Sequence, residues 1–82
     1  MPDPSIMTNS EIDDSILDIN RKLNHLQTMR SNAWDQWGES IRLDYPQEVI
    51  DACEKKAKYL KRRISMYLNR LHAIRNEQRR RI

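Results

Sequence analysis

Apolar residues recur along two stretches of the chain at alternating spacings of three and four residues, the repeat of a coiled-coil helix. The first series is Ile12, Ile16, Ile19, Leu23, Leu26, Arg30, Ala33 and Trp37, and the second is Ile50, Cys53, Ala57, Leu60, Ile64, Tyr67, Leu71 and Ile74. Arg30 is the one charged residue in either series. This pattern predicts two long helices, over about residues 9–43 and about residues 46–79.

The ends of these helices carry recognisable signals. Thr8 and Glu11 have the spacing of a capping box, in which the threonine hydroxyl and the glutamate carboxylate accept from each other's backbone amides. Residues 1–8 contain two prolines and no periodic pattern, so we expect a flexible N-terminal leader. Pro46 disfavours helical geometry at the residue before it and suits the first turn of a new helix. A tight turn is therefore predicted at residues 44–46.

The two predicted helices are nearly equal in length, and a short connection makes them antiparallel neighbours. In that arrangement residues equidistant from the turn face each other, so each apolar position of one series meets an apolar position of the other. Leu26 is expected against Ile64, and Ala33 against Ala57. The sequence thus predicts an all-α fold, an antiparallel two-helix coiled-coil hairpin that forms a single domain over residues 9–82.

A chain of 82 residues with this architecture cannot enclose its own apolar seam. Three further apolar residues flank the seam on one side: Trp34, Ile41 and Leu68. Trp34 is expected either in the core of an oligomer or as the anchor of a partner interface, and we favour the interface because tryptophan is enriched among the residues that dominate binding. We therefore expect the hairpin to be completed to a four-helix bundle, either by dimerisation or by a larger protein.

Charge is divided unevenly along the chain. Residues 1–44 carry eight acids and four bases, whereas residues 45–82 carry four acids and eleven bases, so the two parts have net charges of −4 and +7. Because the hairpin is antiparallel, the acids of residues 11–18 lie at the same end as the arginines of residues 75–81. These opposite charges also suit the dipoles of the two helix ends, and they offset one another.

The middle of the second helix has a basic face that is not offset in this way. Residues 55–63 contain six bases and no acid. The bases predicted on this face, with Lys22 across the hairpin, are Lys55, Lys56, Arg62, Arg63 and Arg70. Tyr59 and Met66 lie along its centre, and an anion between Lys22 and Arg70 would relieve their expected repulsion. Such a face suits the phosphates of nucleic acid, the carboxylates of an acidic protein, or solvent alone.

The chain carries no recognisable catalytic or metal-binding motif. One cysteine and two separated histidines do not make a disulfide or zinc framework, and no glycine-rich phosphate loop or nucleophile–base pair is present. We therefore expect a non-enzyme without cofactor, metal or small-molecule substrate. The chain has no apolar run near the roughly 18 residues of a membrane span and no secretory signal, so a cytoplasmic, reducing location is expected.

Our leading hypothesis is a small non-enzymatic protein–protein interaction module, such as an adaptor, an inhibitor or a minor subunit. It would bind a larger protein through one side of the hairpin, with contacts from Trp34, Ile41, Leu68, Tyr59 and Met66. A nucleic-acid-binding regulator that uses the basic face of the second helix is the alternative. A purely structural self-assembling unit is a third hypothesis.

Overall fold

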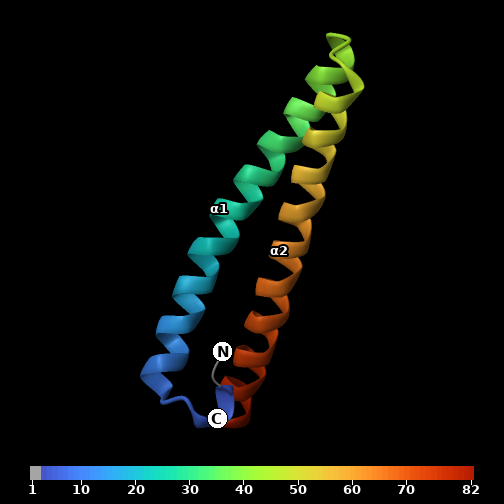
Figure 1. Cartoon of the computed structure of the whole chain (residues 1–82). Coiled ribbons are helices and arrows are strands. Elements are labelled where there is room, and N and C mark those ends of the chain that lie inside the picture. The colour runs from blue at the N-terminus through green and yellow to red at the C-terminus, as the bar shows by residue number, and fades with distance from the viewer. Residues whose placement is uncertain (1–2) are drawn as a thin grey trace.

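The computed structural model describes residues 3–82 and consists mainly of two long helices, α1 (Asn9–Arg42) and α2 (Gln47–Arg80). A short 3-10 helix, η1 (Pro4–Ile6), precedes them. Figure 1 shows α1 and α2 running antiparallel, with the connecting turn at one end and both η1 and the C-terminus at the other. The molecule measures 55 × 16 × 15 Å. The predicted all-α helical hairpin is confirmed.

Helix α1 begins at the predicted capping box. The backbone N–H of Glu11 donates to the Thr8 hydroxyl at 3.1 Å, and the N–H of Thr8 donates to the Glu11 carboxylate at 3.4 Å. Each residue thus satisfies an amide that the helix itself leaves without a partner. The prediction of a capped helix start at this position is confirmed.

The turn combines a Schellman motif with a proline. The N–H of Tyr45 donates to the Ser40 carbonyl at 2.9 Å, and the N–H of Asp44 donates to the Ile41 carbonyl at 3.1 Å. Asp44 has a φ of 56°, the left-handed conformation that such a motif requires just beyond the helix. Pro46 then precedes the first turn of α2. Asp44 therefore reverses the chain, and Pro46 starts the second helix.

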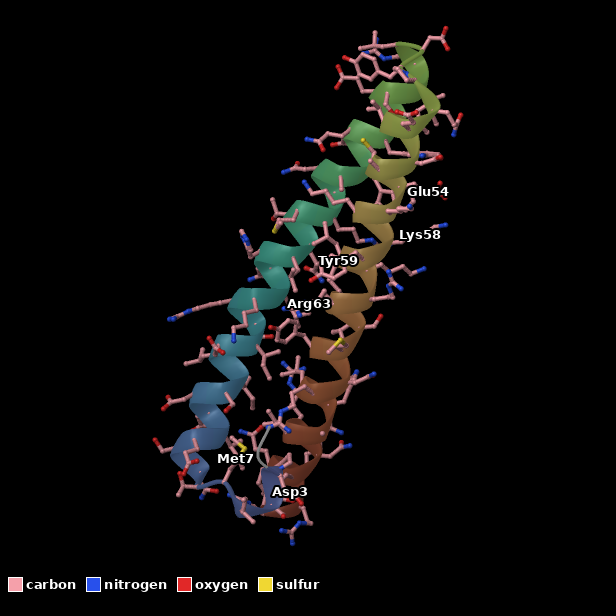
Figure 2. All side chains as sticks on the ribbon, in the orientation of Figure 1. Asp3, Met7, Glu54, Lys58, Tyr59 and Arg63 are labelled. Carbon is pink, nitrogen blue, oxygen red and sulfur yellow. The ribbon has the colours of Figure 1, made fainter. Side chains whose placement is uncertain are left out.

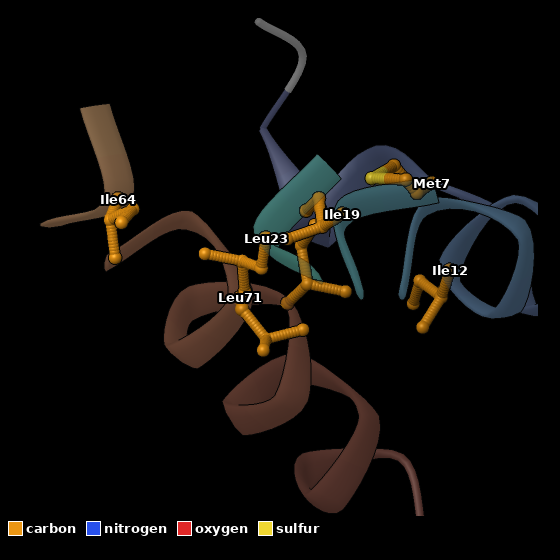
Figure 3. Packing of buried hydrophobic residues seen from close by; sticks show 7 residues of the cluster. Met7, Ile12, Ile19, Leu23, Ile64 and Leu71 are labelled. Carbon is orange, nitrogen blue, oxygen red and sulfur yellow. The ribbon is translucent and has the colours of Figure 1, made fainter. Parts of the chain in front are cut away.

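The apolar seam forms two clusters of buried side chains. The larger cluster contains Met7, Ile12, Ile19, Leu23, Ile64, Leu71 and Ile74, and the smaller contains Ala33, Ala57 and Leu60. Leu26 packs against both clusters. Figure 3 shows Ile19, Leu23 and Leu71 close together within the larger cluster. Buried side chains from both helices therefore pack together from the terminal end of the hairpin as far as Ala33 and Ala57.

The N-terminal segment closes the terminal end of the hairpin, where Figure 1 shows η1 beside α2. The Asp3 carboxylate accepts from the N–H of Ser5 at 3.0 Å, and this bond lowers the pKa of Asp3. Met7 is only 6% exposed and belongs to the larger apolar cluster. This packing could not be predicted, because residues 3–8 have no periodic pattern. The first two residues of the predicted leader lie outside the described part of the chain.

Arg81 ties this segment to the end of α2. Its Nη2 donates to the carbonyl oxygens of Pro4 at 3.1 Å and Ser5 at 3.3 Å, and its Nη1 donates to the Asn9 side chain at 3.0 Å. Its Nε donates to Glu77 at 2.9 Å. The guanidinium thus joins η1, the start of α1 and the last turn of α2.

Candidate functional site

The part of the hairpin nearest the turn, residues 34–56, lacks a buried apolar core. Within residues 34–56, all of which the structure describes, Ser40 is the only buried residue. The larger apolar side chains of this region are all half-buried or exposed, and they are Trp34, Trp37, Ile41, Leu43, Tyr45, Val49, Ile50 and Cys53. These eight residues are termed the apolar tip. Their exposure contrasts with the two buried clusters in the rest of the hairpin.

An aromatic pair lies where the apolar tip meets the smaller buried cluster. Trp34 stands edge-on to Trp37, with ring centroids 5.2 Å apart and ring planes at 86°. This T-shaped arrangement is a favourable aromatic geometry, so each ring orients the other. Both tryptophans remain half-buried, and the Trp37 Nε1 group is buried without a hydrogen-bond partner. The two rings thus form an ordered apolar surface that is still partly exposed and can pack against another protein.

The structure separates the residues that were predicted to flank one side of the seam. Trp34 and Ile41 both belong to the apolar tip. Leu68 does not, because it follows Tyr67, whose ring lies beside Lys22 of α1. That places Leu68 level with about residue 22 of α1, roughly 18 Å from Trp34 along the hairpin axis at 1.5 Å per residue. The three residues therefore do not form one continuous surface.

The sequence reasoning missed part of the apolar tip. Leu43, Tyr45 and Val49 are exposed beside the turn, with exposed fractions of 47%, 47% and 41%. Leu43 and Tyr45 flank the chain reversal, and Val49 lies in the first turn of α2, so none of them belongs to the heptad seam. They could have been predicted from the number of apolar residues close to the turn, because residues near turns are usually polar.

Farther from the turn than the apolar tip, the Tyr67 ring lies beside two cations. Lys22 Nζ is 5.8 Å and Arg63 Cζ is 5.6 Å from the ring centroid, within the range of cation–π contacts. Lys22 also forms an ion pair with Asp18 at 2.8 Å, and this hydrogen bond raises the pKa of Lys22. Asp18 therefore supplies negative charge where we expected Lys22 and Arg70 to need an external anion.

The predicted basic residues of α2 fall on its outer surface. Lys55, Lys56 and Arg62 are exposed, whereas Arg63 and Arg70 are half-buried. A shallow groove of about 530 Å³ runs along this surface and is lined by Arg63, Met66, Tyr67, Asn69 and Arg70. Lys58, on another side of α2, pairs with Glu54 at 2.9 Å (Figure 2). The run of bases is therefore partly offset by an acid of the same helix.

Folding concentrates positive charge at the middle of the hairpin. Residues 15–35 of α1 and 55–75 of α2, which lie side by side, together carry eleven bases and two acids, a net charge of +9. These two segments are termed the basic belt. The rest of the chain carries four bases and ten acids, a net charge of −6. The overall charge of +3 thus conceals a basic middle between two acidic ends.

Neither a search for metal-binding groups nor a comparison with known proteins indicates a function for this fold. Among residues 3–82, no three His, Cys, Asp or Glu side chains gather where they could hold a metal ion. Neither long helix has an apolar stretch suited to crossing a membrane. Comparison of the chain with protein-family models, curated proteins and solved structures finds no match. The apolar tip and the basic belt are therefore the features from which we infer function.

Proposed function

We propose that this hairpin is a small non-enzymatic protein–protein interaction module that docks on a larger protein through the apolar tip. The observation that carries the proposal is that Ser40 is the only buried residue within residues 34–56. A concentration of exposed apolar side chains is typical of interaction sites in soluble proteins. Burial of the apolar tip against another protein would contribute about 25 cal/mol of favourable free energy for each Å² of apolar area removed from water. An adaptor, an inhibitor or a minor subunit would use such a surface.

The charge around the apolar tip indicates the chemistry of the partner. Residues 36–54 carry five acids and one base, a net charge of −4. A partner surface with an apolar depression and a rim of Lys or Arg side chains is complementary to this arrangement. Trp34 is the proposed anchor, because an ordered, half-buried tryptophan loses little conformational freedom on binding.

A second copy of the chain fits the same surface less well. The basic belt lies at the middle of the hairpin, so two copies packed side by side would bring two belts of charge +9 together in either orientation. Contact between two tips would bring two acidic rims together. Like charges across an interface oppose association. We therefore assign the helices that complete a four-helix bundle to a larger protein, in preference to a homodimer or a self-assembling structural unit.

The proposal is tested with the apolar-tip variants Trp34→Ala and Ile41→Ser and the control Leu17→Ala. Leu17 is 58% exposed on α1, far from the turn, and Ile41 is 48% exposed, so neither substitution disturbs a buried cluster. The tagged full-length chain is isolated from its native cell, and the stoichiometry of the recovered complex is measured by native mass spectrometry. We expect wild type and Leu17→Ala to retain one partner, which is then purified for affinity measurement. Loss of a hot-spot tryptophan should weaken that affinity about 30-fold or more.

Sedimentation equilibrium of the purified chain provides the complementary measurement. We expect a monomer across micromolar concentrations, because the basic belt opposes self-association. A dimer that is lost in Trp34→Ala would support the self-assembling unit instead. A partner that binds wild type, Trp34→Ala and Ile41→Ser equally would contradict docking through the apolar tip.

A further inference from the structure

One aromatic side chain of the basic belt has a surrounding unlike that of any residue in the apolar tip. Tyr59 lies on α2 and is 53% exposed. Residues three and four positions away are its neighbours on the helix surface. At Tyr59 these four neighbours are all cations: Lys55, Lys56, Arg62 and Arg63. Figure 2 shows Tyr59 and Arg63 on successive turns, away from the Glu54–Lys58 pair.

These four cations lack acidic partners within the described residues. The ion pairs of the basic belt are Lys22 with Asp18 and Lys58 with Glu54, and neither includes a neighbour of Tyr59. Between positions 55 and 76 of α2 there is no acid at all. The positive charge around the ring is therefore available to an external anion.

We propose that this surface binds single-stranded nucleic acid, with a base stacked on Tyr59 and phosphates on the surrounding Lys and Arg side chains. Proteins that bind single strands combine a positively charged path with exposed aromatic rings. The groove of about 530 Å³ continues this path towards the next turn of α2. Met66, which is 64% exposed, lines it and offers a second apolar contact between cations.

Single-stranded nucleic acid fits this surface better than an acidic protein does. A protein partner needs apolar area to bury, and here the exposed apolar side chains are an isolated tyrosine and methionine among cations. A nucleic-acid strand supplies a regular series of phosphates together with the flat bases that stack on a ring. On α2 the apolar tip ends at Cys53, roughly 9 Å along the helix from Tyr59. Tyr59 and the four cations around it are not members of the apolar tip, so this inference does not depend on protein docking.

The stacking contact is tested by fluorescence anisotropy of the full chain with a labelled oligo-dT of about 15 nucleotides. The variant is Tyr59→Leu, and the matched control is Tyr45→Leu, which changes an equally accessible tyrosine outside the basic belt. Both residues are about half exposed, at 53% and 47%, so neither change removes a buried contact. We expect Tyr59→Leu to weaken binding about 5- to 100-fold, the range for loss of one base-stacking contact. Tyr45→Leu should bind like wild type.

The phosphate contacts are tested with two double variants that remove the same charge. Lys56→Gln with Arg62→Gln changes the basic belt, and Arg42→Gln with Arg79→Gln changes exposed arginines outside it. The belt variant should bind about 10- to 30-fold more weakly at physiological salt, and the slope of log K against log salt should decrease by up to about 1.5 units. The control variant should lose much less, because its arginines lie away from the bound strand.

Several outcomes would overturn the proposal. One is the absence of oligo-dT binding at low salt, and another is equal weakening by Tyr59→Leu and Tyr45→Leu. Equal weakening by the two double variants would indicate a general effect of net charge. Polyglutamate bound as tightly as oligo-dT would indicate an acidic protein ligand. Tighter binding to a duplex of the same length, unaffected by Tyr59→Leu, would indicate duplex phosphates without base stacking.

Discussion

Glu77 and Arg81 are joined by a hydrogen bond of 2.9 Å from Arg81 Nε to Glu77 Oε1, at the end of α2. Glu77 is only 9% exposed, and Arg80 also donates to it at 2.9 and 2.6 Å. The Nη2 group of Arg81 donates to the carbonyls of Pro4 and Ser5 in the N-terminal segment, and its Nη1 group donates to the Asn9 side chain. The carboxylate of Glu77 therefore orients the guanidinium that closes the terminal end of the hairpin.

This arrangement predicts sensitivity of the fold to acid. The hydrogen bonds from Arg80 and Arg81 lower the pKa of Glu77 from 4.5 to about 2. A carboxyl whose pKa is lower in the folded state stabilises the protein above its unfolded pKa, and that contribution is lost as the pH falls through the folded pKa. The free energy of unfolding should therefore fall between about pH 4.5 and pH 2 on account of this group.

Urea denaturation at a series of pH values, followed by circular dichroism, measures this effect. Glu77→Gln should be less stable than wild type at neutral pH and should lose part of the acid dependence. Glu48→Gln removes an exposed carboxylate at the other end of α2, and this variant should retain the acid dependence of wild type. Identical acid dependence in wild type and Glu77→Gln would show that the bonds to Glu77 do not stabilise the fold.

The burial of Met7 predicts that the N-terminal segment contributes to stability. Met7→Ala removes a side chain that is 6% exposed, whereas Met66→Ala removes one that is 64% exposed. We expect Met7→Ala to lower the free energy of unfolding by about 1 to 3 kcal/mol, below the full range for central core sites because this site is at the end of the hairpin. Met66→Ala should change it by less than about 0.5 kcal/mol. Equal effects would mean that Met7 is solvated in solution.

The heptad pattern predicted the hairpin because a repeat of three and four determines which face of each helix is apolar, independent of distant contacts. It could not predict Met7, since one methionine in a segment without periodicity gives no directional signal. Nor could it predict that the seam would be incompletely buried near the turn. Trp34 and Trp37 have suitable spacing, but their burial depends on how many side chains face them across the hairpin.

The candidate binding residues divide in the same way. The cations around Tyr59 could be predicted because helical spacing alone makes residues three and four positions apart neighbours. The predicted register brings residues 22 and 67 to the same level, but the Lys22–Tyr67 contact and the Lys22–Asp18 ion pair depend on side-chain rotamers. Sequence patterning does not determine either. The distance between Leu68 and the apolar tip could also be predicted, because the expected register places Leu68 level with about residue 22.

The layer formed by Ala33 and Ala57 predicts a steric limit on the helix spacing. These residues are 2% and 0% exposed and belong to one buried cluster, so a larger side chain at either position would have to enter that cluster. Ala57→Leu should lower the free energy of unfolding by about 1 to 3 kcal/mol through overpacking. Ala73→Leu, on the exposed side of α2, should be nearly neutral. Thermal unfolding compares the two, and a more stable Ala57→Leu protein would show that this layer contains unfilled space.

The left-handed backbone conformation of Asp44 predicts that a glycine at this position would stabilise the protein. Its φ of 56° is unfavourable for residues with a Cβ, whereas glycine adopts it without strain. Asp44→Gly should therefore raise the free energy of unfolding by about 0.5 to 1 kcal/mol. Asp35→Gly, in the exposed interior of α1, should instead lower it slightly because glycine weakens helices. Urea denaturation of both variants checks this difference in sign, and destabilisation by Asp44→Gly would mean that the Asp44 side chain itself supports the turn.

Arg30 predicts a gain in stability from the loss of a charge. It is half-buried at a seam position, and its Nε is buried without a hydrogen-bond partner, which is energetically unfavourable. Arg30→Met keeps an unbranched aliphatic stem and removes the unpaired donor, so the free energy of unfolding should rise by about 1 kcal/mol. Arg21→Met, at an exposed position of the same helix, controls for the loss of charge and should have little effect.

The same substitution should also loosen the alignment of the two helices, because a polar residue in an apolar seam disfavours registers that bury it more deeply. Distances between spin labels at positions 18 and 72 report this alignment. Wild type should give one narrow distance distribution, and Arg30→Met should give a broader one despite its greater stability. A less stable Arg30→Met protein with an unchanged distribution would show that the guanidinium stabilises the seam and does not select its register.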